Sequence, residues 1–201
     1  MADTMFFSRD TKVYVAPLLA NGTEAGVWEI PVLDGFSFSQ ATNSSEVTLN
    51  EMSAGSNVSR RGRKMFNDSL APAEWSFSTY ARPFKSAGTG DGAADNTAGN
   101  HHAVEEVLWA MTVGNAIQTT YAFQGFTLGT DDLDITFANS NKTTLGKANI
   151  YFTLGGTTGE SKITYKISNC CVNEAGIDFD IDGITTINWS GMGTIITEQA
   201  D

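Results

Sequence analysis

Cysteine, histidine and proline are scarce in this chain of 201 residues, which has two cysteines, two histidines and four prolines. The two cysteines, Cys170 and Cys171, are adjacent, and a disulfide between neighbours in sequence would be strained. On a β-strand their side chains would point to opposite sides, so we expect one buried thiol and one at a surface or an interface. A disulfide from this pair to another subunit is the alternative.

Motifs of targeting, catalysis and cofactor binding are also missing. The N-terminal residues lack the basic start and apolar run of a signal peptide, and no segment approaches the roughly 18 apolar residues that span a bilayer. The sequence contains no G-x-S-x-G, no H-E-x-x-H and no G-K-[ST] ending of a phosphate loop. We therefore expect a protein that matures in a cytoplasm, is not an enzyme, and has neither a cofactor nor a membrane partner.

Two short motifs resemble metal sites without satisfying them. Residues 178–183 read D-x-D-x-D-G, like the start of an EF-hand loop, but the twelfth position is Trp189, where calcium coordination requires Glu. His101 and His102 are adjacent and have no cysteine or histidine cluster near them in sequence. We predict an acidic strand face for the first motif, a surface pair for the second, and no metal site.

Charge is sparse and mostly negative. Asp and Glu number 23 against 12 Lys and Arg, which gives a net charge of -11 and argues against general binding to a phosphate backbone. Ser, Thr, Asn and Gly dominate the polar remainder, and 41% of the residues are apolar. This balance suits a globular, mainly β protein.

Apolar and polar residues alternate with a period of two in many segments, which is typical of antiparallel sheets packed as a sandwich or barrel. In one of these segments Ile177, Phe179 and Ile181 alternate with aspartates, so we expect the three apolar residues to face the core. The alternating apolar positions elsewhere are Val13, Val15, Phe36, Phe38, Trp75, Phe77, Leu133, Ile135, Phe137, Ile150, Phe152, Leu154, Ile163, Tyr165, Ile167, Ile187 and Trp189.

One segment has helical spacing instead. Val104, Val107, Leu108 and Met111 recur at helical intervals, and Gly114 follows as a stop signal, so we predict a helix over about 101–113. Residues 86–100, rich in Gly, Ala, Asn and Asp, precede it as a loop that is flexible or engaged in contacts.

The two halves of the chain resemble each other in pattern. "KVYVAP" has a counterpart in "NIYFTL", and Trp75 corresponds to Trp189. We predict one domain with a first sheet half at 1–85, the loop and helix at 86–114, and a second sheet half at 115–201. The first half carries about twenty additional residues, which predicts an inserted arm at about 50–69 that projects from the sandwich.

The inserted arm contains the main cluster of positive charge. Arg60, Arg61, Arg63 and Lys64 place four of the twelve cations within five residues. A solvated loop tip is one interpretation. Nucleic-acid binding is a second, but aromatic platforms are missing beside the cations and the charge of the whole chain opposes it. The third is an arm that docks on an acidic surface of a neighbouring copy and offsets self-repulsion.

Taken together, these patterns resemble the tail tube proteins of long-tailed bacteriophages. The segments that carry the resemblance are "VLDGFSFSQATNSSEV", the basic insert, "LAPAEWSFSTYARPF", "AVEEVLWAM" and "DIDGITTINWSGMGTII". The resemblance implies homohexameric rings whose inner sheets join into a β-barrel and which stack into a tube in the virion tail, assembled in the host cytoplasm. The tube would hold the tape-measure protein and pass DNA without sequence-specific binding. Further partners would be a sheath protein and baseplate or terminator proteins.

The resemblance also implies roles for particular residues. Arg60, Arg61, Arg63 and Lys64 would form contacts between subunits or rings. A duct for DNA should repel phosphates, so Asp178, Asp180, Asp182 and Asp134 are candidates for a surface that faces the lumen.

Two alternatives come from other functional classes. The first is a carbohydrate-binding β-sandwich module, in which Tyr80, Tyr121 or Tyr151 would stack on sugars. The second is a capsid decoration protein or another β-protein of the virion.

Overall fold

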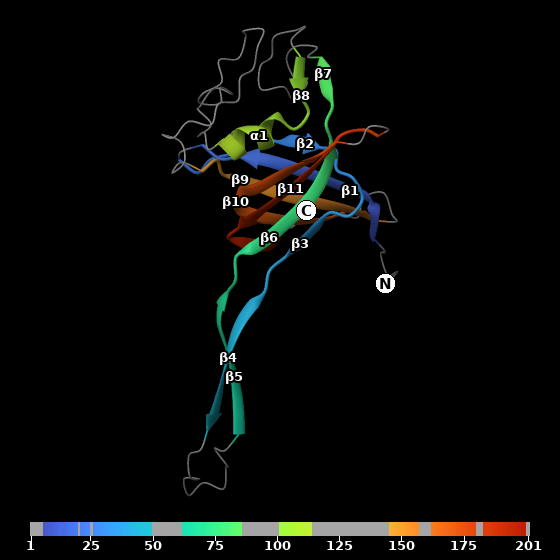
Figure 1. The fold of residues 1–201 in the computed structure, drawn as a ribbon. Coiled ribbons are helices and arrows are strands. Elements are labelled where there is room, and N and C mark those ends of the chain that lie inside the picture. Colours follow the sequence, from blue (N-terminus) through green and yellow to red (C-terminus); the bar gives the residue numbers. More distant parts are fainter. Residues whose placement is uncertain are drawn as a thin grey trace, which may run out of the picture.

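The computed structural model describes residues 6–19, 21–24, 26–49, 62–85, 101–113, 145–156, 162–179 and 183–199 (Figure 1). In this part of the chain one helix accompanies a set of antiparallel strands. The elements are β1 Phe6–Pro17, β2 Trp28–Ile30, β3 Ser37–Ser39, β4 Thr42–Leu49, β5 Gly62–Leu70, β6 Ala73–Tyr80, β7 Pro83–Lys85, β8 His101–Ala103, α1 Glu106–Val113, β9 Ala148–Gly156, β10 Lys162–Asp178, β11 Thr186–Gly193 and β12 Ile195–Gln199.

Two antiparallel sheets share the long strand β10. The first half of β10 pairs with β9 and β12, and β9 continues through β1 to β2. The second half pairs with β11, which continues through β6 to β3. Two smaller antiparallel pairs, β4–β5 and β7–β8, project beyond the sheets at opposite ends of the molecule (Figure 1). The predicted class, mainly β with two packed antiparallel sheets, one helix and a projecting loop or hairpin, is confirmed; across the described residues the sheets do not close into a barrel.

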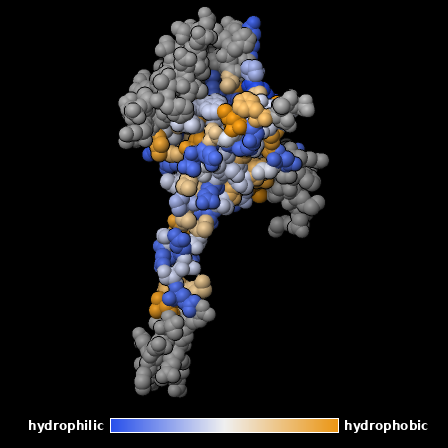
Figure 2. Space-filling model, in the orientation of Figure 1, coloured by the Kyte–Doolittle hydropathy of each residue, from blue (hydrophilic) through white to orange (hydrophobic). Residues whose placement is uncertain are grey.

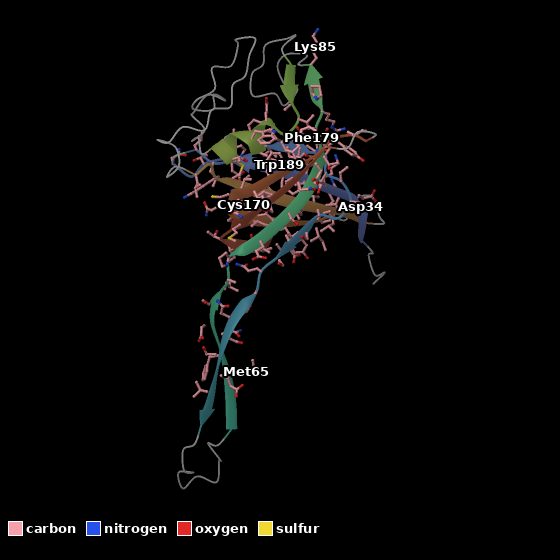
Figure 3. All side chains as sticks on the ribbon, in the orientation of Figure 1. Asp34, Met65, Lys85, Cys170, Phe179 and Trp189 are labelled. Atoms are coloured by element: carbon pink, nitrogen blue, oxygen red, sulfur yellow. The ribbon has the colours of Figure 1, made fainter. Side chains whose placement is uncertain are left out.

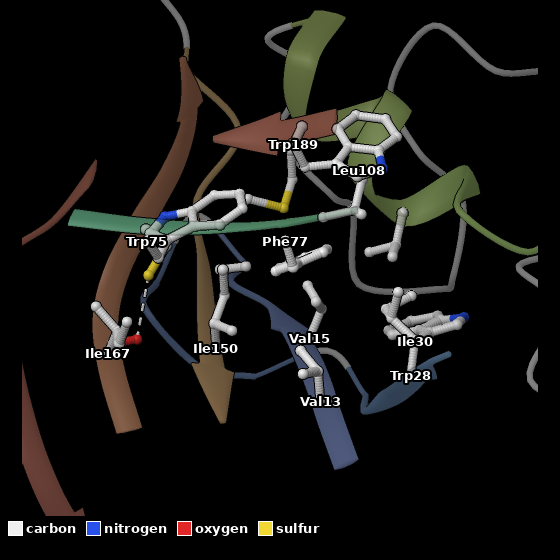
Figure 4. Packing of buried hydrophobic residues seen from close by; sticks show 14 of the residues in the cluster. Val13, Val15, Trp28, Ile30, Trp75, Phe77, Leu108, Ile150, Ile167 and Trp189 are labelled. Atoms are coloured by element: carbon white, nitrogen blue, oxygen red, sulfur yellow. Dashed lines mark hydrogen bonds between the residues drawn. The ribbon is translucent and has the colours of Figure 1, made fainter. Parts of the chain in front are cut away.

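The apolar faces of the two sheets pack against each other, as their alternation predicted (Figure 4). Trp75 and Trp189 from one sheet and Phe152 from the other are almost fully buried. Phe38 on β3 contacts the Phe152 ring at 4.7 Å between centroids, which joins the two layers. The indole Nε1 of Trp189 donates a hydrogen bond of 3.0 Å to Thr79 Oγ1, so this buried polar atom is satisfied.

The segments that the sequence analysis matched between the two halves of the chain form neighbouring strands. Strand β1, with "KVYVAP", pairs with β9, which contains "NIYFTL". Strand β6, with Trp75, pairs with β11, where Trp189 lies opposite Phe77. The corresponding elements of the two halves therefore meet within the same sheets.

The predicted helix was too long at its N-terminal end. Residues 101–103 form β8, which pairs with Pro83–Lys85, and the helix begins only at Glu106. Strand pairing with β7 outweighs the helical spacing there, and the carbonyl of Glu105 accepts the first helical hydrogen bonds from Leu108 and Trp109. Val107, Leu108 and Met111 are buried and close one end of the core.

The prediction that Ile177 and Phe179 face the core was wrong for Phe179 and only partly right for Ile177. Strand β10 ends at Asp178, so the alternation stops there. Phe179 is 81% exposed and Ile177 is 44% exposed, although Ile177 pairs with the buried Ile187. Ile181 lies outside the described residues.

Candidate assembly surfaces

The outward face of the sheet β10–β11–β6–β3 is polar and lacks cations in the part of the chain that the structure describes. Register and exposure place small hydroxyl and amide side chains and three carboxylates on it. We call this surface the polar face. Its polar members are Ser37, Ser39, Glu74, Ser76, Ser78, Glu174, Asp178, Thr186, Asn188 and Ser190. The exposed side chains of Tyr80 and Met192 lie on the same face.

Hydrogen bonds between strands hold the side chains of the polar face. The hydroxyls of Ser37 and Ser76 lie 2.8 Å apart. Ser78 donates to Asn188 Oδ1 at 2.6 Å, and Asn188 Nδ2 donates to Asp178 Oδ2 at 2.6 Å. The Asp178 carboxylate is thus oriented by its neighbour while its residue stays exposed.

One of the four candidate lumen residues lies among the described residues. Asp178 lies on the polar face, whereas Asp134, Asp180 and Asp182 lie outside the described residues. Two further carboxylates, Glu74 and Glu174, which the sequence analysis did not predict, lie on the polar face with Asp178. Glu74 could have been found, because it alternates with Trp75 and Phe77 in "EWSFS". Glu174 follows a bulge in β10 that shifts the period, so no simple alternation identifies it.

The outward face of the other sheet differs, since it carries paired charges of both signs. Glu24 Oε1 accepts hydrogen bonds of 2.5 Å from Asn149 Nδ2 and from the Tyr151 hydroxyl, and Lys166 Nζ lies 3.6 Å away. Burial raises the pKa of Glu24, but these hydrogen bonds and Lys166 outweigh it, so the net effect lowers the pKa. Because Tyr151 is held by Glu24 and covered by Lys166, it is not a free platform for a sugar ring.

The projecting element is the β4–β5 hairpin, which extends well beyond the sheets (Figures 1 and 2). It begins at Thr42, earlier than the predicted arm at about 50–69, and residues 50–61 lie outside the described residues. Its surface combines polar residues with exposed Val47, Met65 and Phe66. In the candidate contact cluster, Arg63 and Lys64 belong to β5 and pair with Thr48 and Val47. Arg60 and Arg61 lie outside the described residues. The structure therefore places half of the basic cluster at the far end of the described arm.

Gln40 lies at the root of the arm, between β3 and β4. Its Nε2 donates to the carbonyl of Ala71 at 2.8 Å and to that of Thr194 at 3.0 Å. Its Oε1 accepts a hydrogen bond of 3.1 Å from the amide of Ile196. One side chain thus connects both strands of the arm to the corner between β11 and β12. Sequence alone did not reveal this role, since no local pattern marks Gln40.

At the opposite end of the molecule an open groove of about 550 Å³ lies between α1, β7, β8 and the end of β10. We call it the Glu105 groove. Glu105 is 1% exposed, and burial raises the pKa of its carboxyl against the opposing effects of Arg82 and Thr79. The residues that line the groove are Ala81, Arg82, Pro83, Ala103, Glu105, Trp109, Ile177, Phe179, Thr185 and Ile187.

The two cysteines have different environments. Cys170 is buried in the core, its Sγ lies 3.3 Å from the carbonyl oxygen of Ile167, and burial raises the pKa of its thiol to about 12. Cys171 is half-buried, and its pKa is also raised by burial. Only Cys171 thus has partial access to solvent.

Within the described residues, no group of three or more His, Cys, Asp or Glu side chains is arranged to hold a metal ion. The described helix is too short to cross a membrane. The adjacent pair His101 and His102 lies in strand β8.

The fold of the chain is similar to that of two terminator proteins of contractile injection systems. The chain superimposes on the tube-terminating cap of the anti-feeding prophage with a TM-score of 0.53 and 11% identity, over 100% of this chain and 95% of the other. It superimposes equally on the sheath/tube terminator of the extracellular contractile injection system PVC, with a TM-score of 0.53 and 10% identity over 100% of both chains. At these identities the likeness concerns the fold.

The sequence is similar to that of the tail tube protein pb6 of Escherichia phage T5. The two are 32% identical over 189 residues, which cover 92% of this chain. The chain spans about a third, 36%, of the length of that relative. No model of a protein family matches the chain. The resemblance to tail tube proteins that the sequence patterns indicated is confirmed by the similarity to pb6.

Proposed function

We propose that this chain is a structural subunit of a phage tail tube. Its copies assemble into hexameric rings that stack into a tube in the virion tail, built in the host cytoplasm. The tube holds the tape-measure protein and passes DNA, and its ends and exterior meet terminator, baseplate or sheath proteins. Similarity to a tail tube protein over nearly the whole chain supports this proposal.

The observation that carries the proposal is the absence of cations from the described polar face. Serine side chains and Asn188 share the face with the exposed Tyr80 and Met192, and Glu74, Glu174 and Asp178 add negative charge. A cation there would attract the phosphates of passing DNA and hold the strand at every ring. A neutral to acidic lining repels the strand weakly and lets it move. We therefore assign the polar face to the lumen, together with Asp134, Asp180 and Asp182.

The outer strands of the sheets offer a route to ring closure. Strand β3 pairs with β6 along three residues, and β2 pairs with β1 along three residues; within the described part of the chain, the other edge of each is open. Open edges present unpaired backbone groups that a second copy can complete. Pairing of the β3 edge with an edge strand of a second copy would extend the sheet β10–β11–β6–β3 around the tube.

The arm provides the contact between rings. A chain with a net charge of -11 repels its own copies, so stacking requires local attraction. Arg60, Arg61, Arg63 and Lys64 concentrate positive charge on the projecting element. The arm thus carries the charge that offsets the repulsion and aligns the rings.

Cryo-electron microscopy of the purified chain tests the function. We expect tubes of stacked six-fold rings in which Glu74, Glu174 and Asp178 face the lumen. Discrete monomers under all assembly conditions would contradict a tube subunit. Tubes in which these three carboxylates are buried between subunits would contradict the lumen assignment alone.

A further inference from the structure

Glu105 carries a buried carboxyl group for which the proposed function has no use. The residue is 1% exposed and immediately precedes α1, where its backbone carbonyl accepts hydrogen bonds from the amides of Leu108 and Trp109. Glutamates are rarely buried, because an ionised carboxylate loses its hydration in the interior. The packing around Glu105 is therefore sensitive to whether its carboxyl is protonated.

The neighbours of the Glu105 carboxyl compensate its charge only in part. The hydroxyl of Thr79, on β6, hydrogen-bonds to it, and Arg82, which follows β6, is the charged group that acts on it within the described residues. Arg82 is exposed, so solvent screens its attraction. In the described part of the chain Oε1 of Glu105 has no hydrogen-bond partner. An ionised Glu105 thus has an incomplete set of donors.

Burial raises the pKa of the Glu105 carboxyl, and hydrogen bonds with its own backbone and with Thr79, together with Arg82, offset this only partly. In the unfolded chain the carboxyl has its ordinary, lower pKa. A group whose pKa is higher in the folded protein stabilises the fold while it is protonated, and this contribution is lost as pH rises through the folded pKa. Glu105 therefore favours the folded structure in mild acid and opposes it once the carboxyl is ionised.

A chain of contacts joins Glu105 to both tryptophans at this end of the core. Nε1 of Trp189 donates a hydrogen bond of 3.0 Å to Thr79 Oγ1, which leaves the hydroxyl proton of Thr79 available for Glu105. The Trp189 ring meets the ring of Trp109, on α1, edge to face at 4.8 Å between centroids. Figure 4 shows Trp189 beside the helix that carries Leu108. Glu105 is thus connected to both sides of the contact between α1 and β11.

Helix α1 borders the Glu105 groove, which lies at the end of the molecule away from the arm, as Phe179 and Met65 show in Figure 3. We infer, independently of the tube function, that protonation of Glu105 controls how firmly α1 is held on the core. The helix is held firmly while the carboxyl is neutral and less firmly once it is ionised. Because Trp109 lines the groove, the same change alters the wall of the groove. We call these two states the Glu105 switch.

Hydrogen exchange of the α1 amides tests the Glu105 switch. The amides of Leu108 and Trp109 donate to the carbonyl of Glu105, so their protection reports directly on the start of the helix. We expect their protection factors to increase as pH falls from 7.5 to 5, by at most about tenfold per pH unit for one titrating group. Protection that is independent of pH, or that decreases in acid, would overturn the inference.

Amides in the β9–β10 pairing separate a local effect from a global one, since they report on the main sheet. Their protection should change less with pH than that of α1. An equal change in both places would show a global effect and would overturn a switch that acts on the helix.

Carbon-13 NMR of the Glu105 carboxyl follows the titration without any substitution. We expect one titration step whose midpoint lies above the ordinary glutamate value, in the same pH range as the change in α1 protection. A midpoint at or below the ordinary value would overturn the inference.

Matched variants identify the titrating group. Glu105→Gln keeps the shape of the side chain without the charge, so protection of α1 should no longer depend on pH. The two histidines of the chain, His101 and His102 in β8, titrate in a similar range, and their double replacement by Gln should keep the pH dependence. Glu106→Gln, at the neighbouring buried carboxyl, should keep it as well. Retention of the dependence in Glu105→Gln would overturn the inference, and its loss in one of the control variants would then show which group is responsible.

Discussion

The side chain of Gln40 accepts a hydrogen bond from the amide of Ile196, 156 residues away, while its own amide group donates to two carbonyl oxygens. The three hydrogen bonds connect the root of the arm to the β11–β12 corner. Ala71 also donates its amide to the carbonyl of Ala41 across the root, so backbone and side chain together set the direction of the arm. These bonds hold the arm at a defined angle to the sheets.

Replacing Gln40 should loosen the arm. We expect Gln40→Ala to lower the free energy of unfolding by about 1–2 kcal/mol, because it leaves three polar backbone groups without their partner. Gln40→Glu should cost more, since it places a carboxylate against the carbonyls of Ala71 and Thr194. Gln199→Ala, which removes only an exposed bond to Thr197, is the control. Urea unfolding checks the order, and equal stability of all four proteins would exclude an anchoring role.

Gly191 should not tolerate any side chain. A Cβ atom at this position would lie 2.1 Å from the carbonyl oxygen of Cys171 and 2.5 Å from the Trp75 ring. Neither the strand β10 nor the buried indole can move freely, so Gly191→Ala should lower the free energy of unfolding by about 1–3 kcal/mol or more. At Gly176 the nearest atoms are 4.0 Å away, and Gly176→Ala should be nearly neutral. Comparable thermal midpoints for both variants would contradict this account of the packing.

Stability should fall at alkaline pH because of Cys170. Burial raises the pKa of its thiol from 9.0 to about 12 in the folded protein. Above pH 9 the unfolded thiol ionises while the folded one stays protonated, so the free energy of unfolding decreases as pH rises, by up to about 1.4 kcal/mol per pH unit. Cys170→Ala should reduce this slope, and Cys171→Ala should retain most of it. Urea titrations at pH 8 and 10.5 give the free energy of unfolding of each protein. An identical decrease between the two pH values for wild type and Cys170→Ala would refute the role of the Cys170 thiol.

Alternation in sequence predicted most of the core but not the path of β10. Trp75, Phe77, Ile187 and Trp189 lie inward as expected, because β6 and β11 pair without interruption. Strand β10 has register shifts between Ile167 and Cys170 and again between Val172 and Glu174. Each shift changes which face the following residues occupy, so a fixed period of two fails across it.

Features that depend on pairing between distant residues could not be predicted. Residues 101–103 have helical spacing with the residues that follow, and only pairing with β7 reveals a strand. The Gln40 anchor and the Glu105 groove arise where segments far apart in the chain meet. The basic cluster and the arm, by contrast, were visible as a local excess of charge and of chain length in one half.

Phe179 and Ile187 should respond differently to the same substitution. Phe179→Asp places a carboxylate at a position that is 81% exposed, so the monomer should keep its stability. Ile187 is 3% exposed and packs in the core, so Ile187→Asp should unfold the protein, since an unpaired buried carboxylate costs several kcal/mol, roughly. Circular dichroism separates the two effects. Unfolding of both variants would place Phe179 in a core.

The basic cluster should act in assembly rather than in folding. Replacing Arg60, Arg61, Arg63 and Lys64 by Ser changes the net charge from -11 to -15, since four cations are lost. The monomer should remain folded, because the cluster lies in the arm and outside the core. Each exposed ion pair contributes only about 0.2–1 kcal/mol, but the copies in a ring act together, so we expect shorter and less stable tubes.

A second variant separates the position of the charge from its amount. Replacing Lys12, Lys85, Lys147 and Lys162 by Ser also gives a net charge of -15 but leaves the arm unchanged. If the arm cations make specific contacts, tubes of this control should stay close to wild type in length, whereas tubes of the arm variant should not. If both variants shorten the tubes equally, general repulsion explains the effect. Arm-variant tubes as long as those of the wild type would identify the cluster as a solvated surface.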